Sequence, residues 1–229
     1  SRPGFAWLRR EVAHSGWGTF ESCMVFAIAL LVFHPNFPLD PHHYNFFLGP
    51  VNDMLHGKAL LYETTHLYGV LDVYFLAFVF TYLLPLTYPM AALVITFLFG
   101  AFFMGMYLFI KRWLNSRFLA VVGVLCLYSI LYLFQTSPTR SALFFPAMTP
   151  LRYGWYLLIL FLLLAFSKTG RPIWRTATIF SSVAALFWVF DAGFFLVAAS
   201  FLTLAYYVTR SASRPAGALL RLAGQYALA

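Results

Sequence analysis

Residues 88–110 have the sequence YPMAALVITFLFGAFFMGMYLFI and decide the fold, because this run is continuously apolar and contains no charged side chain. A helix that crosses a bilayer needs about 20 such residues. A membrane β-strand would instead show about ten residues of alternating polarity. The run therefore predicts a transmembrane α-helix.

Other apolar runs extend along the rest of the chain. They occupy residues 18–34, 69–86, 118–134, 153–167 and 177–208. Asp191 interrupts the last run, which is too long for one span, so we expect two short helices that meet near Asp191. The chain is 62% hydrophobic and 10% charged, whereas soluble domains carry about 25% charged residues. We expect an all-α, polytopic transmembrane helical bundle, with residues 1–229 forming a single transmembrane domain that is the amino-terminal part of a longer protein.

The basic residues predict the orientation of this bundle. Twelve of the fifteen Lys and Arg residues fall before the first span or within 111–117, 168–175 and 210–221. Cytoplasmic loops of membrane proteins are rich in Lys and Arg, so these clusters are placed inside. The net charge of +8 then needs no nucleic-acid partner. We expect a multi-pass protein of the bacterial plasma (inner) membrane, in contact with membrane lipids.

This orientation requires an odd number of crossings between residues 69 and 110, although two apolar runs lie there. Pro85 and Pro89 break the helix between the two runs. Either one run is a re-entrant or surface helix, or the orientation rule fails for residues 111–117.

Polar side chains are concentrated in residues 34–72, which contain four of the seven acids and five of the six histidines. Within this segment, apolar residues recur at spacings of three and four. They are Tyr44, Phe47, Leu48, Val51 and Leu55. This spacing predicts an amphipathic helix on the membrane surface, which Pro50 could start. We expect an outer catalytic loop at about residues 34–68.

Asp40 follows the first span closely and could act as a general base, hold a divalent cation, or cap a helix that starts at Pro41. Asp53 is the second candidate base, on the polar side of the surface helix. His42 and His43 could donate hydrogen bonds to a phosphate or be solvated surface residues. The spacing of these residues and His56 matches no strong metal motif, so no metal ligand is assigned.

Isolated charged residues stand out elsewhere. Asp72 and Asp191 lie in apolar surroundings, and ionisable residues at membrane depth are functional candidates. We expect Asp72 at the mouth of its helix and Asp191 deeper. Arg140 and Arg152 break the rule that outer loops avoid basic residues. Each could bind a phosphate through its planar fork or face an acid within the membrane.

Three stretches resemble the GT-C class of membrane glycosyltransferases, and within it the polyprenyl-phosphate-sugar enzymes that include protein mannosyltransferases and aminoarabinose transferases. The first is LDPHHYNFFLGPVNDMLHGKALLYETTHLYGVLDVYFLAFVF, residues 39–80. The others are FFPAMTPLRYGWYLL, residues 144–158, and FWVFDAGFFLVAAS, residues 187–200. In that class an Asp follows span one, and Asp40 holds this place, although Pro41 stands where a second acid is common.

The resemblance implies an enzyme that moves a sugar from a lipid-linked donor, a polyprenyl phosphate, to an unknown acceptor on the outer face. Asp40 would activate the acceptor, and Arg152, Arg140 and Lys58 would meet the lipid phosphate. No nucleotide cofactor is implied.

Two other functions fit the same sequence. A transporter or flippase for a lipid-linked or anionic substrate would depend chiefly on Asp191, since transporters use broken helices and intramembrane acids. A non-catalytic membrane subunit would use the polar loop to bind a partner.

Overall fold

The computed structural model describes residues 16–32, 41–66, 68–135, 149–211 and 215–229. Within these ranges every regular element is an α-helix, which confirms the all-α prediction for this part of the chain. The helices are α2 (Gly16–Val32), α3 (Pro41–Leu55), α4 (Leu71–Tyr82), α5 (Tyr88–Leu114), α6 (Arg117–Gln135), α7 (Pro150–Thr169), α8 (Pro172–Trp188), α9 (Phe190–Ser211) and α10 (Pro215–Ala227).

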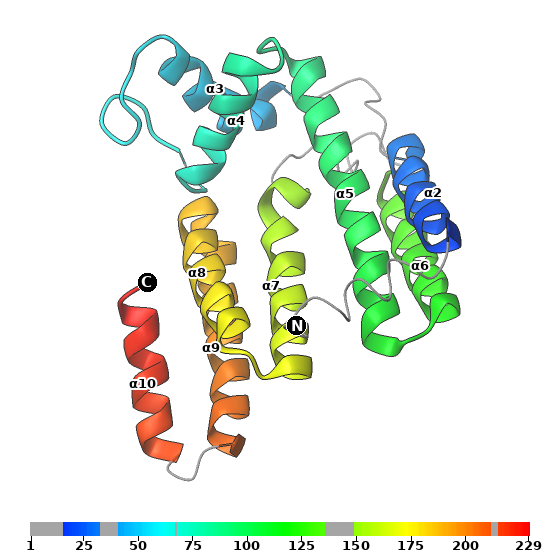
Figure 1. Ribbon diagram of the computed structural model, residues 1–229. Helices are drawn as coiled ribbons and strands as arrows, with labels where there is room; N and C mark the ends of the chain where they lie inside the picture. The colour runs from blue at the N-terminus through cyan, green and yellow to red at the C-terminus, as the bar shows by residue number, and fades with distance from the viewer. Residues whose placement is uncertain (1–15, 33–40, 67, 136–148, 212–214) are drawn as a thin grey trace.

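Among the described helices, three are long and apolar enough to cross a membrane, namely α5, α7 and α9. The longest is α5, whose 27 residues extend over about 40 Å at 1.5 Å per residue. It packs against α2 and α6 on one side and α7 on the other. Helices α8 and α9 form an antiparallel pair next to α7, and α10 packs on α9 (Figure 1).

The two apolar runs between residues 69 and 110 have different positions. Helix α4 has 12 residues and is about 18 Å long, too short for a hydrocarbon core of about 30 Å. Figure 1 shows α4 beside α3, beyond the ends of α7 and α8. Helix α5 begins after Pro85, with Thr87 as its N-cap and Pro89 in its first turn. The first run therefore forms a short helix at one end of the bundle, and only the second run forms a long helix.

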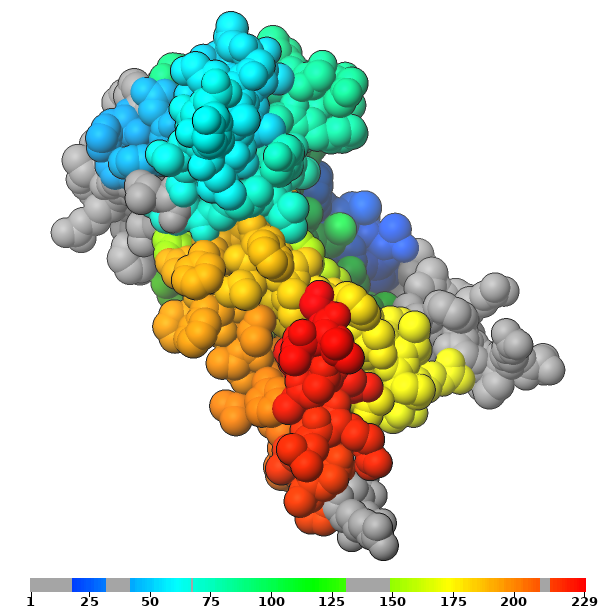
Figure 2. Space-filling model, turned by 90° about the vertical axis from the view of Figure 1, so that its left-hand side faces the viewer, coloured from blue at the N-terminus to red at the C-terminus, as the bar shows by residue number. Residues whose placement is uncertain are grey.

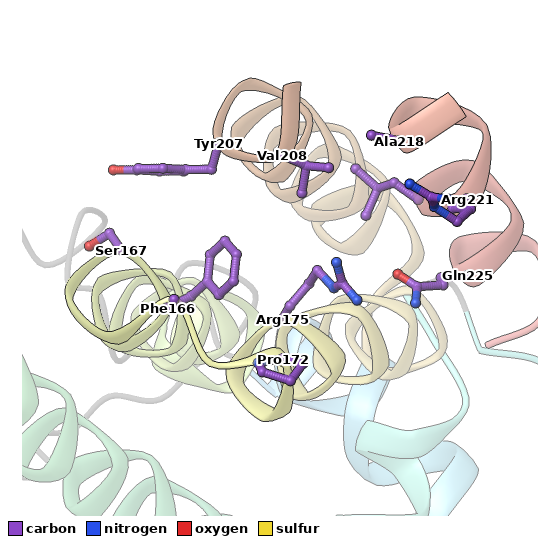
Figure 3. A pocket seen from close by; sticks show the side chains of 11 residues that line it. Phe166, Ser167, Pro172, Arg175, Tyr207, Val208, Ala218, Arg221 and Gln225 are labelled. Carbon is purple, nitrogen blue, oxygen red and sulfur yellow. The ribbon is translucent and has the colours of Figure 1, made fainter. Parts of the chain in front are cut away.

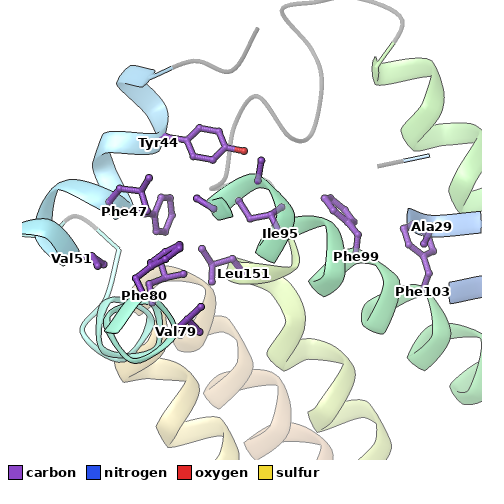
Figure 4. Close-up of a cluster of buried hydrophobic side chains, with 14 of the residues drawn as sticks. Ala29, Tyr44, Phe47, Val51, Val79, Phe80, Ile95, Phe99, Phe103 and Leu151 are labelled. Atoms are coloured by element: carbon purple, nitrogen blue, oxygen red, sulfur yellow. The ribbon is translucent and has the colours of Figure 1, made fainter. Parts of the chain in front are cut away.

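Helix α3 carries the predicted apolar face, but it begins at Pro41, and Pro50 lies inside it rather than at its start. Tyr44, Phe47 and Val51 are at most 2% exposed. They lie against α4 and the start of α5, with Phe47 and Val51 beside Phe80 (Figure 4). Protein, rather than lipid, therefore covers most of this face, because α4 folds back over it.

The last apolar run forms two helices that meet at Val189, as the interruption at Asp191 predicts. The two backbones approach closely at this corner. A Cβ atom at Gly193 would lie 2.3 Å from the carbonyl oxygen of Ala185, so only glycine fits this position without a shift.

The two ends of the bundle differ in charge. The turns from α5 to α6 and from α7 to α8, together with the end of α9, lie at one end (Figure 1). These positions carry Lys111, Arg112, Arg117, Lys168, Arg171 and Arg210. Residues 41–72 lie at the opposite end, where they cover the end of α8 (Figure 2). The predicted orientation assumes that Lys and Arg are concentrated on one side of the membrane, and the two ends of the bundle differ in this way.

Candidate functional site

The segment that joins α3 to α4 is fixed onto the corner between α8 and α9 by two backbone hydrogen bonds. The Val70 N–H donates to the Phe187 carbonyl oxygen at 2.8 Å, and the Phe190 N–H donates to the Tyr68 carbonyl oxygen at 2.6 Å. A Cβ atom at Gly69 would lie 1.9 Å from the Trp188 carbonyl oxygen. Glycine at this position therefore lets the two backbones meet.

His66 and Asp72 form a buried pair across this turn. Nε2 of His66 lies 3.0 Å from Oδ2 of Asp72, and both side chains are 0% exposed. The other carboxylate oxygen of Asp72 accepts the Val73 N–H at 2.8 Å. Nδ1 of His66 is buried and has no hydrogen-bond partner among the described residues. The pair therefore joins the two sides of this turn away from water.

Aromatic rings surround the His66 side chain. Phe47 of α3 stacks on Tyr68 with ring centroids 5.1 Å apart and an interplanar angle of 6°. The His66 ring meets Phe47 and Tyr68 edge-on, at 5.3 Å and 5.7 Å. This packing holds the imidazole in one orientation next to Asp72.

Arg152 reaches the same segment from α7. Its Nη2 donates to Oδ2 of Asp191, and its guanidinium carbon lies 5.2 Å from the Tyr68 ring centroid and 5.3 Å from that of Tyr153. Cations over aromatic faces are attracted by the ring electrons. We refer to His66, Tyr68, Asp72, Arg152 and Asp191 as the junction cluster, since they join α4, α7 and the α8–α9 corner.

The positions of these charges on their helices follow electrostatics. Asp72 and Asp191 lie in the first turns of α4 and α9, where the helix dipole favours an acid. Arg152 lies in the first turn of α7, where the dipole opposes a cation, and its contact with Asp191 offsets this cost. Arg152 therefore faces an acid in the structure, and its binding of a phosphate stays a prediction.

Asp72 lies at the mouth of its helix, as predicted, since it is in the first turn of α4. The expectation that Asp191 lies deeper than Asp72 does not match their exposure, because Asp72 is fully buried whereas the side chain of Asp191 is 51% exposed. Asp72 is covered because the 66–72 turn folds onto the α8–α9 corner and brings His66 over it. Asp191 is exposed because the break at Val189 places it at the outermost turn of α9.

Asp53 and Lys58 form a separate pair beyond the end of α3. The Lys58 ammonium lies 2.8 Å from Oδ1 of Asp53. Hydrogen bonds from Lys58, and then from Thr64, hold the pKa of Asp53 below its ordinary value. The charge of the nearby His56 adds a smaller lowering of the same pKa, and Nδ1 of His56 lies 2.8 Å from the Asn52 carbonyl oxygen. A lowered pKa makes Asp53 a weak base.

The remaining predicted site residues are described only in part. The rings of His42 and His43 lie 5.4 Å apart in the first turn of α3. Asp40 and Arg140 fall outside the described residues, so their roles stay predictions. Among the described residues, no group of three metal-ligating side chains is close enough to hold a metal ion.

An open cavity of about 470 Å³ lies between α3 and the start of α5. Its polar lining is uncharged and consists of Asn45, Asn52, Thr87 and Tyr88. The Tyr88 hydroxyl donates to Oδ1 of Asn45 at 2.8 Å. Amides and hydroxyls can bind the hydroxyl groups of a neutral, polar ligand.

Sequence reasoning missed His66 as the partner of Asp72. The signal was present, because a lone acid in an apolar run needs a partner. His66 is six positions away, and Gly69 between them allows the chain to turn back. Comparisons with protein-family models, curated proteins and solved structures gave no match for this chain.

Proposed function

We propose that this chain is the membrane domain of a GT-C-type glycosyltransferase, multi-pass in a bacterial plasma (inner) membrane. It takes a sugar from a polyprenyl-phosphate donor and transfers it to an acceptor at the end of the bundle that carries α3 and α4. This end faces the outside, and the basic end faces the cytoplasm, in keeping with the positive-inside rule.

The observation that carries the proposal is the position of Arg152 between Asp191 and the Tyr68 ring. An arginine presents a planar fork of donors that matches a phosphate. Here contacts with Asp191 and Tyr68 hold the guanidinium group of Arg152 in one place. Tyr68 belongs to the stretch 39–80, whose sequence resembles the GT-C class. Asp191 is half exposed, so an arriving phosphate can compete with it for the guanidinium.

In the proposed reaction the acceptor hydroxyl attacks the anomeric carbon of the sugar. The bond between that carbon and the phosphate oxygen breaks, the hydroxyl proton passes to Asp40, and polyprenyl phosphate leaves. Arg152 stabilises the charge that develops on the leaving phosphate. The uncharged cavity lined by Asn45, Asn52 and Tyr88 suits a sugar or a hydroxyl-bearing acceptor.

A second candidate is a proton-coupled transporter or flippase, and the buried His66–Asp72 pair favours it. Chains of acids and histidines within membranes carry protons in pumps and transporters. In that case His66 and Asp72 are required for activity, and the carrier crosses the membrane with its sugar still attached.

The test reconstitutes the full-length protein in liposomes with polyprenyl-phosphate mannose or polyprenyl-phosphate aminoarabinose, labelled in the sugar. A transferase moves the label from the carrier to an acceptor in a bacterial membrane extract. Arg152→Lys keeps the charge but loses the fork, so donor binding weakens, while Arg210→Lys makes the same change at the opposite end of the bundle, beside Tyr206, and serves as the matched control. Label that crosses the bilayer and stays on the carrier rejects the transferase in favour of the transporter.

A further inference from the structure

A second cavity lies at the basic end of the bundle, opposite the junction cluster. It measures about 400 Å³ and is enclosed by the turn from α7 to α8, the end of α9, and α10. Figure 3 shows Arg175 from α8, together with Arg221 and Gln225 from α10, extending into the same space. The volume falls within the usual range of ligand pockets, about 300–1,000 Å³.

The two arginines have no counter-charge in the described part of the chain. The cavity lining contains no acid, and among the described residues the ion pairs involve neither Arg175 nor Arg221. Nε of Arg175 is buried and lacks a hydrogen-bond partner among these residues. A buried donor of this kind costs free energy until something accepts from it.

The amino-terminal end of α8 adds positive potential to the cavity. Pro172 and Arg175 of its first turn line the cavity, and no described side chain caps this turn. The amino-terminal end of a helix carries a partial positive charge, so Arg175 lies where the helix itself repels a cation. An anion in the cavity would relieve both the repulsion and the unmet hydrogen-bond donor.

The walls of the cavity limit the kind of anion. Phe166, Val208 and Leu222 contribute apolar surface beside the two guanidinium groups. A planar guanidinium binds phosphate oxygens through paired hydrogen bonds. Basic pockets between membrane helices on the cytoplasmic side bind phospholipid headgroups.

We propose that this cavity binds a phosphate group, carried either by the headgroup of an anionic phospholipid or by a soluble phosphorylated molecule. Arg175 and Arg221 bind the phosphate oxygens, and Gln225 donates a further hydrogen bond. The site is independent of the proposed sugar transfer, because its residues lie at the other end of the bundle.

The experiment compares the purified full chain with Arg175→Gln, Arg221→Gln and the double variant. Arg210→Gln is the matched control, since Arg210 lies at the same end but binds the Tyr206 hydroxyl outside the cavity. In one arm, native mass spectrometry measures lipid retained from nanodiscs of phosphatidylglycerol mixed with phosphatidylcholine. In the other arm, thermal unfolding in detergent is followed as pyrophosphate is added.

Each arginine should contribute about tenfold or more to affinity, the usual scale for hydrogen bonds to charged groups. Selective retention of phosphatidylglycerol that falls in the Gln variants, but not in Arg210→Gln, supports the proposal with a lipid ligand. Stabilisation by pyrophosphate with the same variant pattern supports it with a soluble ligand.

The proposal is overturned if the parent and the double variant retain the same amount of phosphatidylglycerol and are stabilised equally by pyrophosphate. If the double variant does not fold, Arg221→Gln alone decides, because Arg221 lies on an exposed part of α10 and its loss leaves the core of the helix pair intact. An Arg221→Gln protein that matches the parent in both arms then overturns the proposal.

Discussion

Nε2 of His66 lies 3.0 Å from Oδ2 of Asp72, and neither side chain is exposed. The pair closes a turn that is fixed by backbone hydrogen bonds to the α8–α9 corner. The same turn carries Tyr68, whose ring lies under the guanidinium of Arg152. A single buried pair therefore positions the ring over which Arg152 is held.

Replacing Asp72 by Ala should destabilise the protein strongly. Removing one member of a buried, hydrogen-bonded pair costs about 3–5 kcal/mol, because His66 is left without its partner. Asp191→Ala is the control and should cost about 1 kcal/mol or less, since Asp191 is half exposed. Unfolding of the detergent-solubilised proteins measures both values. Equal losses in the two variants would contradict a structural role for the buried pair.

Gly69→Ala should displace the 66–72 turn from the α8–α9 corner. The new Cβ would lie 1.9 Å from the Trp188 carbonyl oxygen, and overpacking of this kind costs about 1–3 kcal/mol or more. Gly49→Ala is the matched control, because a Cβ there meets nothing within 4 Å. In α3 this change should stabilise by up to about 1 kcal/mol. Thermal unfolding of both variants measures these changes. A Gly69→Ala protein as stable as the parent would contradict the close approach of Gly69 to the Trp188 backbone.

The pKa of Asp53 should rise towards its ordinary value in Lys58→Gln, since the hydrogen bond from Lys58 is the largest cause of its lowering. A lowered folded-state pKa means that the unfolded chain takes up the proton first as pH falls. The stabilising effect is therefore present above the unfolded value of 3.8 and is lost as pH falls through the folded value. Carboxyl carbon NMR titration of parent and variant measures the change. An unchanged Asp53 titration would remove Lys58 as the cause.

Residues 42 and 172 should lie on opposite sides of the membrane. The basis is the difference in charge between the two ends of the bundle. In a background with Cys23 and Cys126 replaced by Ala, His42→Cys should react with an impermeant maleimide in intact cells. Pro172→Cys should react only after the membrane is opened. Reaction of both from the same side would reject the proposed orientation.

Much of the fold could be predicted from the sequence, because its helices follow local patterns. The apolar run 88–110 defines most of α5, and the interruption at Asp191 marks the corner between α8 and α9. The spacing of Tyr44, Phe47 and Val51 defines the buried face of α3. Each of these signals lies within a single element, so no knowledge of the tertiary structure is needed.

The candidate site was harder to predict because it depends on contacts between elements. The burial of Asp72 results from the turn at Gly69, and that turn is held by Phe187 and Phe190, which lie far along the chain. Likewise, Asp191 and Arg152 are 39 positions apart, so sequence spacing could suggest an acidic partner for Arg152 but not identify it. The sequence allowed two starts for α3, at Pro41 and at Pro50, and the helix begins at Pro41.

The role of Asp40 as the general base is tested most directly by measuring sugar transfer by full-length Asp40→Asn beside full-length Asp53→Asn. The amide keeps the shape of Asp40 and any capping hydrogen bond but removes its basicity. Transfer from the labelled polyprenyl-phosphate donor should fall by about a hundredfold or more in Asp40→Asn, with donor binding retained. It should stay near the parent rate in Asp53→Asn, whose carboxylate is already a weak base. Near-normal transfer by Asp40→Asn, with loss in Asp53→Asn, would move the base to Asp53, and normal transfer by both would contradict the account.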